Sequence, residues 1–97
     1  MLKLLKLKEF KSEYARLLSL PQWSTKRKAI LKRDKFRCRC CGNGASLQVH
    51  HRQYHKNKNT SDYKAPWEYE DKLLITLCNR CHNKGHQIYS IPVFIIN

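Results

Sequence analysis

Apolar residues along the first third of the chain recur with the period of an α-helix. Between residues 2 and 18 they stand three or four positions apart or side by side, as Leu7, Phe10, Tyr14, Leu17 and Leu18. This spacing places them on one face and predicts a helix over much of the stretch, which Pro21 interrupts. A second helix is expected to begin after Ser24 or Thr25, either of which can cap it, and to run to about residue 34.

The second half of the chain has the shorter period of strands. The segments "SLQVHH" (46–51) and "KLLITL" (72–77) are typical of strands. The polar, lysine-rich stretch between them (52–69) contains a proline and is expected to be a long loop, a feature that is often functional in compact domains. The segment "CNRCHNKGHQIY" (78–89) is expected to turn into a helix. This order predicts an α+β fold with a ββα core and an N-terminal helical extension.

The length of 97 residues is enough for one domain. A domain of this size buries a modest share of its surface, so a bound metal or a disulfide would add needed stability. We expect an N-terminal helical extension (1–22), a core domain (23–90) and an apolar C-terminal tail (91–97). The tail contains "IPVFII" and is expected to pack on the core or on a partner chain.

The charge balance narrows the choice of partners. Lysine and arginine outnumber aspartate and glutamate by 20 to 7, which gives a net charge of +13. This excess predicts a polyanionic partner, either a nucleic acid, an acidic protein or an anionic membrane. No apolar run is long enough to span a bilayer and the N-terminus lacks the features of a signal peptide, so a cytoplasmic protein is expected. The N-terminal "MLKLLKLKEF" suits a short amphipathic surface helix, which keeps a membrane-active protein as a weaker alternative.

Four of the five cysteines form two pairs with the same spacing. Two residues separate Cys38 from Cys41, and two separate Cys78 from Cys81. A Cys-x2-Cys turn brings two thiolates to one cation, and two such turns supply the four ligands of tetrahedral Zn2+. In a reducing compartment this spacing favours a metal site over disulfides. Because all four ligands are thiolates, the predicted zinc is structural and ties the turn before the first strand to the last helix.

Two further residues bear on this zinc site. Cys40 forms only a Cys-x-Cys pair with Cys38, which matches the second turn poorly, so we leave Cys40 out of the ligand set. Gly42 follows the first pair and supplies the backbone freedom that the turn needs.

Four of the five histidines form a second pattern. His82 and His86 stand four residues apart in the predicted last helix, where they share one face and are spaced to hold a metal ion together. A ββα arrangement brings the end of the first strand near this helix, so one residue of the adjacent pair His50 and His51 can complete a three-histidine site. Adjacent strand residues point to opposite faces, which predicts one ligand and one free imidazole. The alternative is a set of solvated polar histidines, the better interpretation for His55.

Several of these segments together resemble a known family. The motifs "RDKFRCRCCG", "LQVHH" and "PWEYEDKLLITLCNRCH" look like the HNH nuclease family in its zinc-bound ββα-metal form. The upstream "YARLLSLPQWSTKRKAILKRD" resembles the lead-in of stand-alone HNH proteins, so the resemblance covers about residues 14–86. It implies a DNA endonuclease that hydrolyses phosphodiester bonds with one divalent metal ion.

The resemblance also implies a role for each histidine. His50 corresponds to a metal ligand and His51 to the general base. His82 corresponds to a metal ligand or a phosphate-contacting residue, and His86 to a further metal ligand. The base takes a proton from the water that attacks the scissile phosphorus, and Arg52 is a candidate to hold the phosphate. An all-histidine site is expected to accept Ni2+, Co2+, Mn2+ or Zn2+ more readily than Mg2+.

Basic side chains are expected to bind DNA phosphates with weak sequence preference. The candidates are Lys26, Arg27, Lys32, Arg33, Lys56, Lys58 and Arg80. For Arg52 and Arg80, a generic basic surface is an equally good explanation.

One position departs from the family pattern. The family usually has an Asn five residues before the first cysteine of the second pair, where it pins the loop that carries the base, and this chain has Leu73. Asp71, or the "PWEY" segment through Trp67, is expected to take over that role. The competing hypothesis is a non-catalytic zinc module that only binds nucleic acid. The charge and the cysteines fit both hypotheses, whereas the two histidine pairs favour the enzyme.

Overall fold

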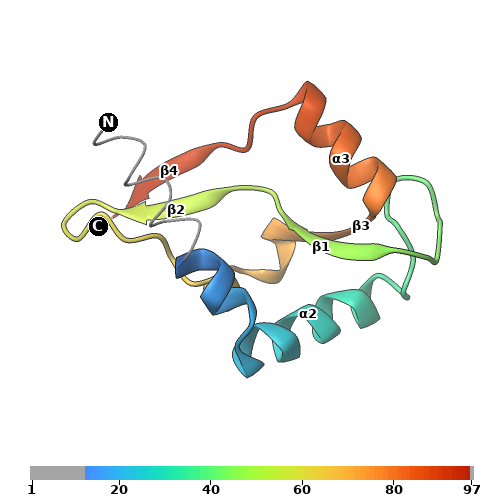
Figure 1. The fold of residues 1–97 in the computed structure, drawn as a ribbon, viewed down its shortest axis with the longest axis horizontal. Coiled ribbons are helices and arrows are strands. Elements are labelled where there is room, and N and C mark those ends of the chain that lie inside the picture. Colours follow the sequence, from blue (N-terminus) through green and yellow to red (C-terminus); the bar gives the residue numbers. More distant parts are fainter. Residues whose placement is uncertain (1–12, 97) are drawn as a thin grey trace.

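The two predicted strands pair with each other at the centre of the molecule. The computed structural model describes residues 13–96, in which β1 (Leu47–His51) and β3 (Leu74–Cys78) form an antiparallel ladder. Helix α2 (Pro21–Arg33) lies along one side of this ladder and helix α3 (Asn79–Ile88) along the other (Figure 1). The chain is therefore an α+β protein, as the order of the predicted elements indicated, and it has a second small sheet that was not predicted.

Helix α2 begins earlier than predicted. Its first residue is Pro21 and its N-cap is Leu20, so neither Ser24 nor Thr25 caps it. The prediction failed because proline is well tolerated in the first turn of a helix, where its missing N–H has no helical partner to lose. The end of the helix agrees with the prediction, since Asp34 is its C-cap.

The helix predicted before α2 is described only in part. Residues 13–18 are helical, and within them Tyr14 is buried while Leu18 is 39 % exposed. The expected apolar positions Leu7 and Phe10 lie outside the described residues. Within residues 13–96 there is no helix with the length and apolar character needed to cross a bilayer.

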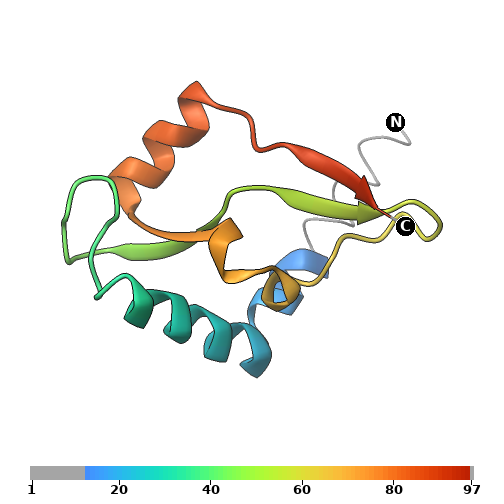
Figure 2. The ribbon, with the colours of Figure 1, turned by 180° about the vertical axis from the view of Figure 1, so that it is seen from behind.

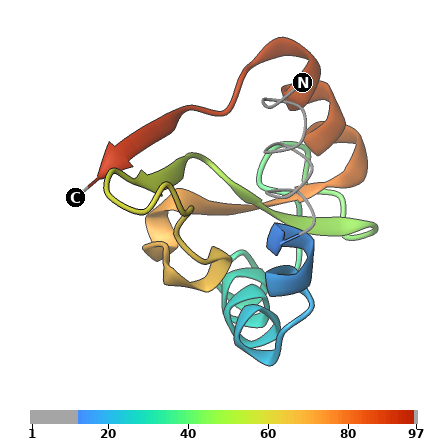
Figure 3. The same cartoon turned by 60° about the vertical axis from the view of Figure 1, so that its left-hand side comes forward.

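Two strands lie where the sequence predicted a loop and a tail. Strand β2 (Tyr54–Asn57) falls inside the expected loop, and strand β4 (Val93–Ile96) forms from the expected tail. They pair in parallel as a second two-stranded sheet, side by side in Figure 3. Strand β2 was missed because its residues lack an apolar alternation and its partner is distant in the sequence. The tail packs by backbone pairing, and Val93, Phe94 and Ile95 stay 45 %, 50 % and 61 % exposed.

The core lies between α2 and the β1–β3 ladder. Its buried centre consists of Trp23, Ile30, Tyr69 and Leu74. Tyr69 comes from the connection before β3, which contains two 3-10 helices, η1 (Pro66–Glu68) and η2 (Asp71–Leu73), seen from behind in Figure 2. The Tyr69 hydroxyl accepts a hydrogen bond from the His55 backbone N–H at 2.9 Å. This connection thus closes the core over the end of β1.

Asp34 links α2 to β3 through a buried carboxylate. Its oxygens accept hydrogen bonds from the guanidinium groups of Arg33 and Arg39 and from the Thr76 backbone N–H, each at 2.9 Å. Burial alone would raise the pKa of this carboxyl, but the three donors hold it well below its usual range. A charged group can stay buried here because each of its partners is in place.

Candidate metal centres

Four thiols meet between the turn that follows α2 and the first turn of α3. The Sγ atoms of Cys38, Cys41, Cys78 and Cys81 all lie within 4.8 Å of one another. The Sγ atoms of Cys41 and Cys78, which belong to different pairs, are 3.6 Å apart. Zinc–sulfur bonds of about 2.3 Å at tetrahedral angles would separate two sulfur atoms by about 3.8 Å. The cluster therefore fits one zinc ion held by the four predicted ligands.

The backbone of both turns supports thiolate ligands. The Cys41 N–H points to the Cys38 Sγ at 3.4 Å, and the Cys81 N–H points to the Cys78 Sγ at 3.5 Å. Donors to sulfur favour the thiolate, which is the form that binds metal. Gly42 donates its N–H to the Cys38 carbonyl at 2.8 Å with a φ of 81°. This left-handed conformation is the backbone freedom that the sequence predicted at Gly42.

The thiols of this cluster differ in their surroundings. Burial raises the pKa of Cys38, but backbone N–H groups led by that of Cys41 lower it more strongly, to about 6. Hydrogen bonding to the Cys78 thiol raises the pKa of Cys81. A bound cation would displace the remaining protons, because metal ligation requires the thiolate form. Cys40 is exposed and lies outside the four-cysteine cluster, as its spacing predicted.

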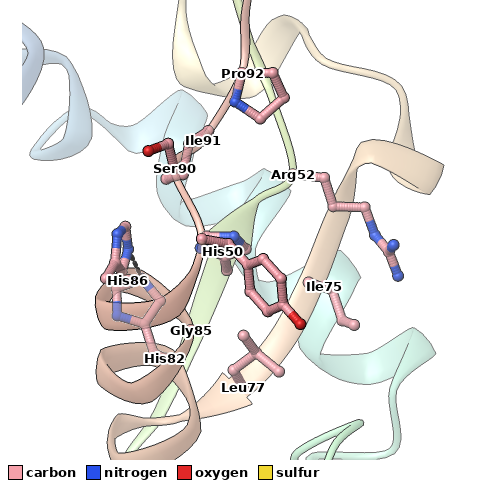
Figure 4. Close-up of a pocket in the computed structure, with 11 residues that line it drawn as sticks. His50, Arg52, Ile75, Leu77, His82, Gly85, His86, Ser90, Ile91 and Pro92 are labelled. Atoms are coloured by element: carbon pink, nitrogen blue, oxygen red, sulfur yellow. Dashed lines mark hydrogen bonds between the residues drawn. The ribbon is translucent and has the colours of Figure 1, made fainter.

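A second cluster consists of three imidazoles that join β1 to α3. His50 comes from β1, and His82 and His86 lie one turn apart on α3 (Figure 4). One nitrogen of each ring lies within 4.8 Å of the others, and the two Nε2 atoms on α3 are 3.1 Å apart. Two nitrogens bound at about 2.1 Å to one ion would stand about 3.0 Å apart at right angles and about 3.4 Å at tetrahedral angles. The three side chains therefore fit a single divalent ion.

Two imidazoles of this cluster, His50 and His82, favour their neutral forms. Burial, together with the neighbouring His82 and His86, lowers the pKa of His50 to about 4. Burial also lowers the pKa of His82. At pH 7 the rings of His50 and His82 are therefore neutral and present lone pairs, which is the state that a metal ion needs.

A cavity of about 390 Å³ lies beside the three histidines. All three rings line it, together with the exposed Arg52 and apolar side chains from β3 and the segment after α3. The guanidinium of Arg52 extends to the opposite side of the cavity from the two α3 histidines (Figure 4). Gly85 and Tyr89 also line the cavity, and neither residue was predicted from the sequence to belong to a site.

His51 lies on the other face of β1 and has a different environment. Its ring stacks between Trp23 and Tyr54, with centroid distances of 5.2 Å and 5.3 Å, and the residue is 4 % exposed. Its Nε2 lies 3.0 Å from the Pro66 carbonyl oxygen. A carbonyl only accepts hydrogen bonds, so Nε2 carries the proton and Nδ1 keeps the lone pair in the neutral ring. Burial lowers the pKa of His51, which keeps the ring neutral.

The Pro66 carbonyl holds the ring of His51 in place. The contact comes from the "PWEY" segment, as expected, but from the backbone of Pro66 and not through Trp67. Asp71, the other candidate, instead pairs with Lys26 at 2.5 Å. The Leu73 carbonyl accepts a hydrogen bond from the backbone N–H that follows His51, at 2.8 Å. The residue type of Pro66 gave no signal for this role, because a backbone carbonyl is present at every position.

The basic residues predicted to bind DNA fall into two groups. The guanidinium of Arg33 is used internally, since it bonds Asp34 and the carbonyls of Asp71 and Leu74. The structure therefore gives Arg33 a structural role, and Lys26 and Arg27 also make internal contacts with Asp71 and the Leu47 carbonyl. The others lie at or near the surface, namely Lys32, Lys56, Lys58 and Arg80.

Comparison with known proteins gives no match: no family model, no curated protein and no solved structure is similar to this chain. The chemistry of the two clusters is therefore the basis for assigning a function.

Proposed function

We propose that the protein is a metal-dependent DNA endonuclease that resembles HNH nucleases and has a ββα-metal core. The observation that carries the proposal is the convergence of His50, His82 and His86 beside a cavity, on a chain with a net charge of +13. In this proposal β1, β3 and α3 form the ββα unit, and the four cysteines hold a structural zinc that fixes α3 against β1. A metal site built only from neutral side chains keeps its full positive charge for an anionic substrate.

The proposed chemistry assigns one task to each part of the site. When bound by His50, His82 and His86, a divalent ion such as Mn2+, Co2+, Ni2+ or Zn2+ supplies electrostatic stabilisation to the phosphodiester under attack. The exposed guanidinium of Arg52 across the cavity holds a phosphate oxygen. The products expected from in-line attack of water are a 5′-phosphate and a 3′-hydroxyl.

His51 is the proposed general base, acting through Nδ1. The Pro66 carbonyl fixes the tautomer in which Nε2 carries the proton, so Nδ1 is the nitrogen that takes a proton from water. The sandwich between Trp23 and Tyr54 fixes the plane of the ring. A ring that is held in one tautomer and one plane is preorganised for proton transfer.

One observation favours a second candidate function, a zinc module that binds nucleic acid without cleaving it. His51 is 4 % exposed and does not line the cavity beside the histidine cluster. A binding module would use His51 only as a core residue. The enzyme differs from the module in requiring the three-histidine cluster, because phosphate contacts alone need only basic side chains.

The experiment that separates the two functions is nicking of supercoiled plasmid DNA by the zinc-loaded protein. We expect nicking that depends on added Mn2+, Co2+ or Ni2+ and that disappears in the His82→Ala variant. Gln87→Ala is the matched control, because Gln87 is an exposed residue of α3 that lines neither the cavity nor the cluster. Plasmid binding without nicking in every metal would support the module instead.

A further inference from the structure

A second hollow lies on α3 next to the cavity of the histidine cluster. It has a volume of about 510 Å³, and Arg80 and Lys84 line it together with apolar and thiol side chains. Gly85 and Tyr89 line both hollows. The two hollows therefore meet over these two residues, and the surface continues from the three imidazoles to two cationic side chains.

Gly85 lies at this junction, although neither its backbone conformation nor its packing within the described chain requires a glycine. It lies in α3 between His82 and His86 (Figure 4), where glycine is less favourable than alanine because it loses more backbone freedom on folding. Its backbone does not adopt a positive φ, and a Cβ built on it meets no atom within 4 Å. No neighbour within the described chain excludes a side chain here, so the open space above the helix backbone is available to a ligand.

Tyr89 follows α3 and presents a large aromatic surface at the same place. The residue is 72 % exposed, the highest value among the exposed large hydrophobic residues of the described chain. Its backbone N–H is fixed to the Gly85 carbonyl at 2.8 Å, which ties its position to the junction. An exposed aromatic ring beside cationic side chains is the combination that binds single-stranded nucleic acid, because a base stacks on the ring while phosphates meet the cations.

We propose that Gly85 and Tyr89 form a nucleotide platform that selects DNA with an unpaired base next to the cleaved phosphate. The scissile phosphate lies at the histidine cluster, the strand passes over Gly85, and the adjacent base stacks on Tyr89. Arg80 and Lys84 hold phosphates further along the strand. A base in an intact duplex is stacked on its neighbours and does not reach the ring, so the substrate is single-stranded or locally unpaired DNA. This inference rests on the proposed nuclease function in one respect only, which is the position of the cleaved phosphate at the histidine cluster.

Binding tests the platform separately from cleavage. The anisotropy of a labelled short oligothymidylate is measured with zinc-loaded protein and no other added metal, beside a duplex of the same length. We expect the single strand to bind more tightly, and Tyr89→Ala to weaken it between about fivefold and a hundredfold, the range of one base–aromatic stack. Tyr89→Phe keeps the ring and should bind as the wild type does. Phe36→Ala removes another exposed aromatic ring, 56 % exposed and outside both hollows, and should change nothing.

The Gly85→Ala variant distinguishes a role of Gly85 in binding DNA from a purely structural role. The substitution should raise the melting temperature, because alanine favours the helix, and at the same time weaken binding of the single strand by filling the space above α3. Gln87→Ala is the control on the same helix and should leave single-strand binding unchanged. Wild-type affinity in both Tyr89→Ala and Gly85→Ala would overturn the platform.

The outcomes also distinguish the platform from the nuclease. If single-strand binding depends on Tyr89 but no metal supports nicking, the platform stands and the proposed function fails. If metal-dependent nicking occurs at the same rate on single-stranded and duplex DNA and is unaffected by Tyr89→Ala, the nuclease stands and the platform fails.

Discussion

At the scale of single residues, His50 and His51 show how two neighbours of the same type acquire different chemistry. His50 faces α3 and meets two other imidazoles, whereas His51 faces α2 and stacks between Trp23 and Tyr54. The alternation of strand residues predicted this separation. The residue that orients His51 was not predictable from side-chain chemistry, because it acts through the carbonyl of Pro66.

Replacement of His51 tests its role as the general base. We expect His51→Ala to reduce the nicking rate between about a hundredfold and ten-thousandfold, the usual range for loss of a general base. Because His51 also fills the core, the melting temperature of the His51→Ala protein must be measured to show that it folds. Added imidazole should restore part of its nicking rate. The His55→Ala variant, which replaces a different histidine, is the control and should nick at the wild-type rate. A folded His51→Ala protein that nicks at the wild-type rate would exclude His51 as the base.

The pH dependence of nicking follows from the same residue. Burial lowers the pKa of His51, so its base form persists to lower pH than that of an ordinary histidine. The wild-type rate should therefore stay level through the neutral range and decline only below about pH 6.5, the ordinary pKa of histidine. A decline that is centred above that pH would show that another group limits the reaction.

Asp34 carries a stability prediction at the same scale. Asp34→Asn keeps the shape of the side chain but removes the charge that Arg33, Arg39 and the Thr76 N–H surround. We expect a loss of about 3 kcal/mol in the free energy of unfolding at pH 7, measured with urea. Because the pKa of Asp34 is lowered in the folded state, its contribution is present above the unfolded pKa and declines as the pH falls below about 4. The difference in unfolding free energy between the wild type and Asp34→Asn should therefore narrow in acid. A difference that widens in acid would contradict this prediction.

At the scale of elements, the sequence predicted the parts that position the two clusters and missed the parts around them. Strands β1 and β3 and helix α3 carry clear periodicity, and the paired cysteines mark where they join. Strands β2 and β4 have no comparable local signal, because a parallel pair depends on contacts between distant segments. The start of α2 was misplaced because a proline can open a helix as well as end one.

The cysteines provide the prediction at this scale. We expect Cys78→Ser to lose bound zinc and most of its helical circular dichroism, because Cys78 ends β3 and caps α3 as well as belonging to the cluster. Cys40→Ser is the matched control, since Cys40 is exposed and outside the cluster. One zinc per chain should remain in the control. Zinc retained by Cys78→Ser at the wild-type level would show that the four-thiol site is wrong.

At the scale of the whole molecule, the fold brings together two groups of side chains that could each hold a metal ion, and both groups involve helix α3. The thiols join the turn after α2 to the start of α3, and the imidazoles join β1 to the next turns of the same helix. The class of fold, the four thiols and the pairing of His82 with His86 followed from spacing in the sequence, whereas the choice of His50 over His51 came from the resemblance to HNH nucleases. The cavity could not be predicted from spacing, because it depends on how α3 and the following segment pack against β3. The hollow beside it depends on how α3 and Tyr89 lie against the turn that carries Cys40 and Cys41.

We propose above that the three imidazoles form a divalent-metal centre distinct from the four thiols. Its most direct test is a crystal structure of the zinc-loaded protein with added Mn2+, in which anomalous scattering locates and distinguishes the two metals. We expect one zinc among the cysteines and one manganese bonded to nitrogens of His50, His82 and His86 at about 2.2 Å, with at least one open coordination position. A metal peak at the cysteines alone, with the three imidazoles free of metal at saturating Mn2+, would rule out the histidine metal centre.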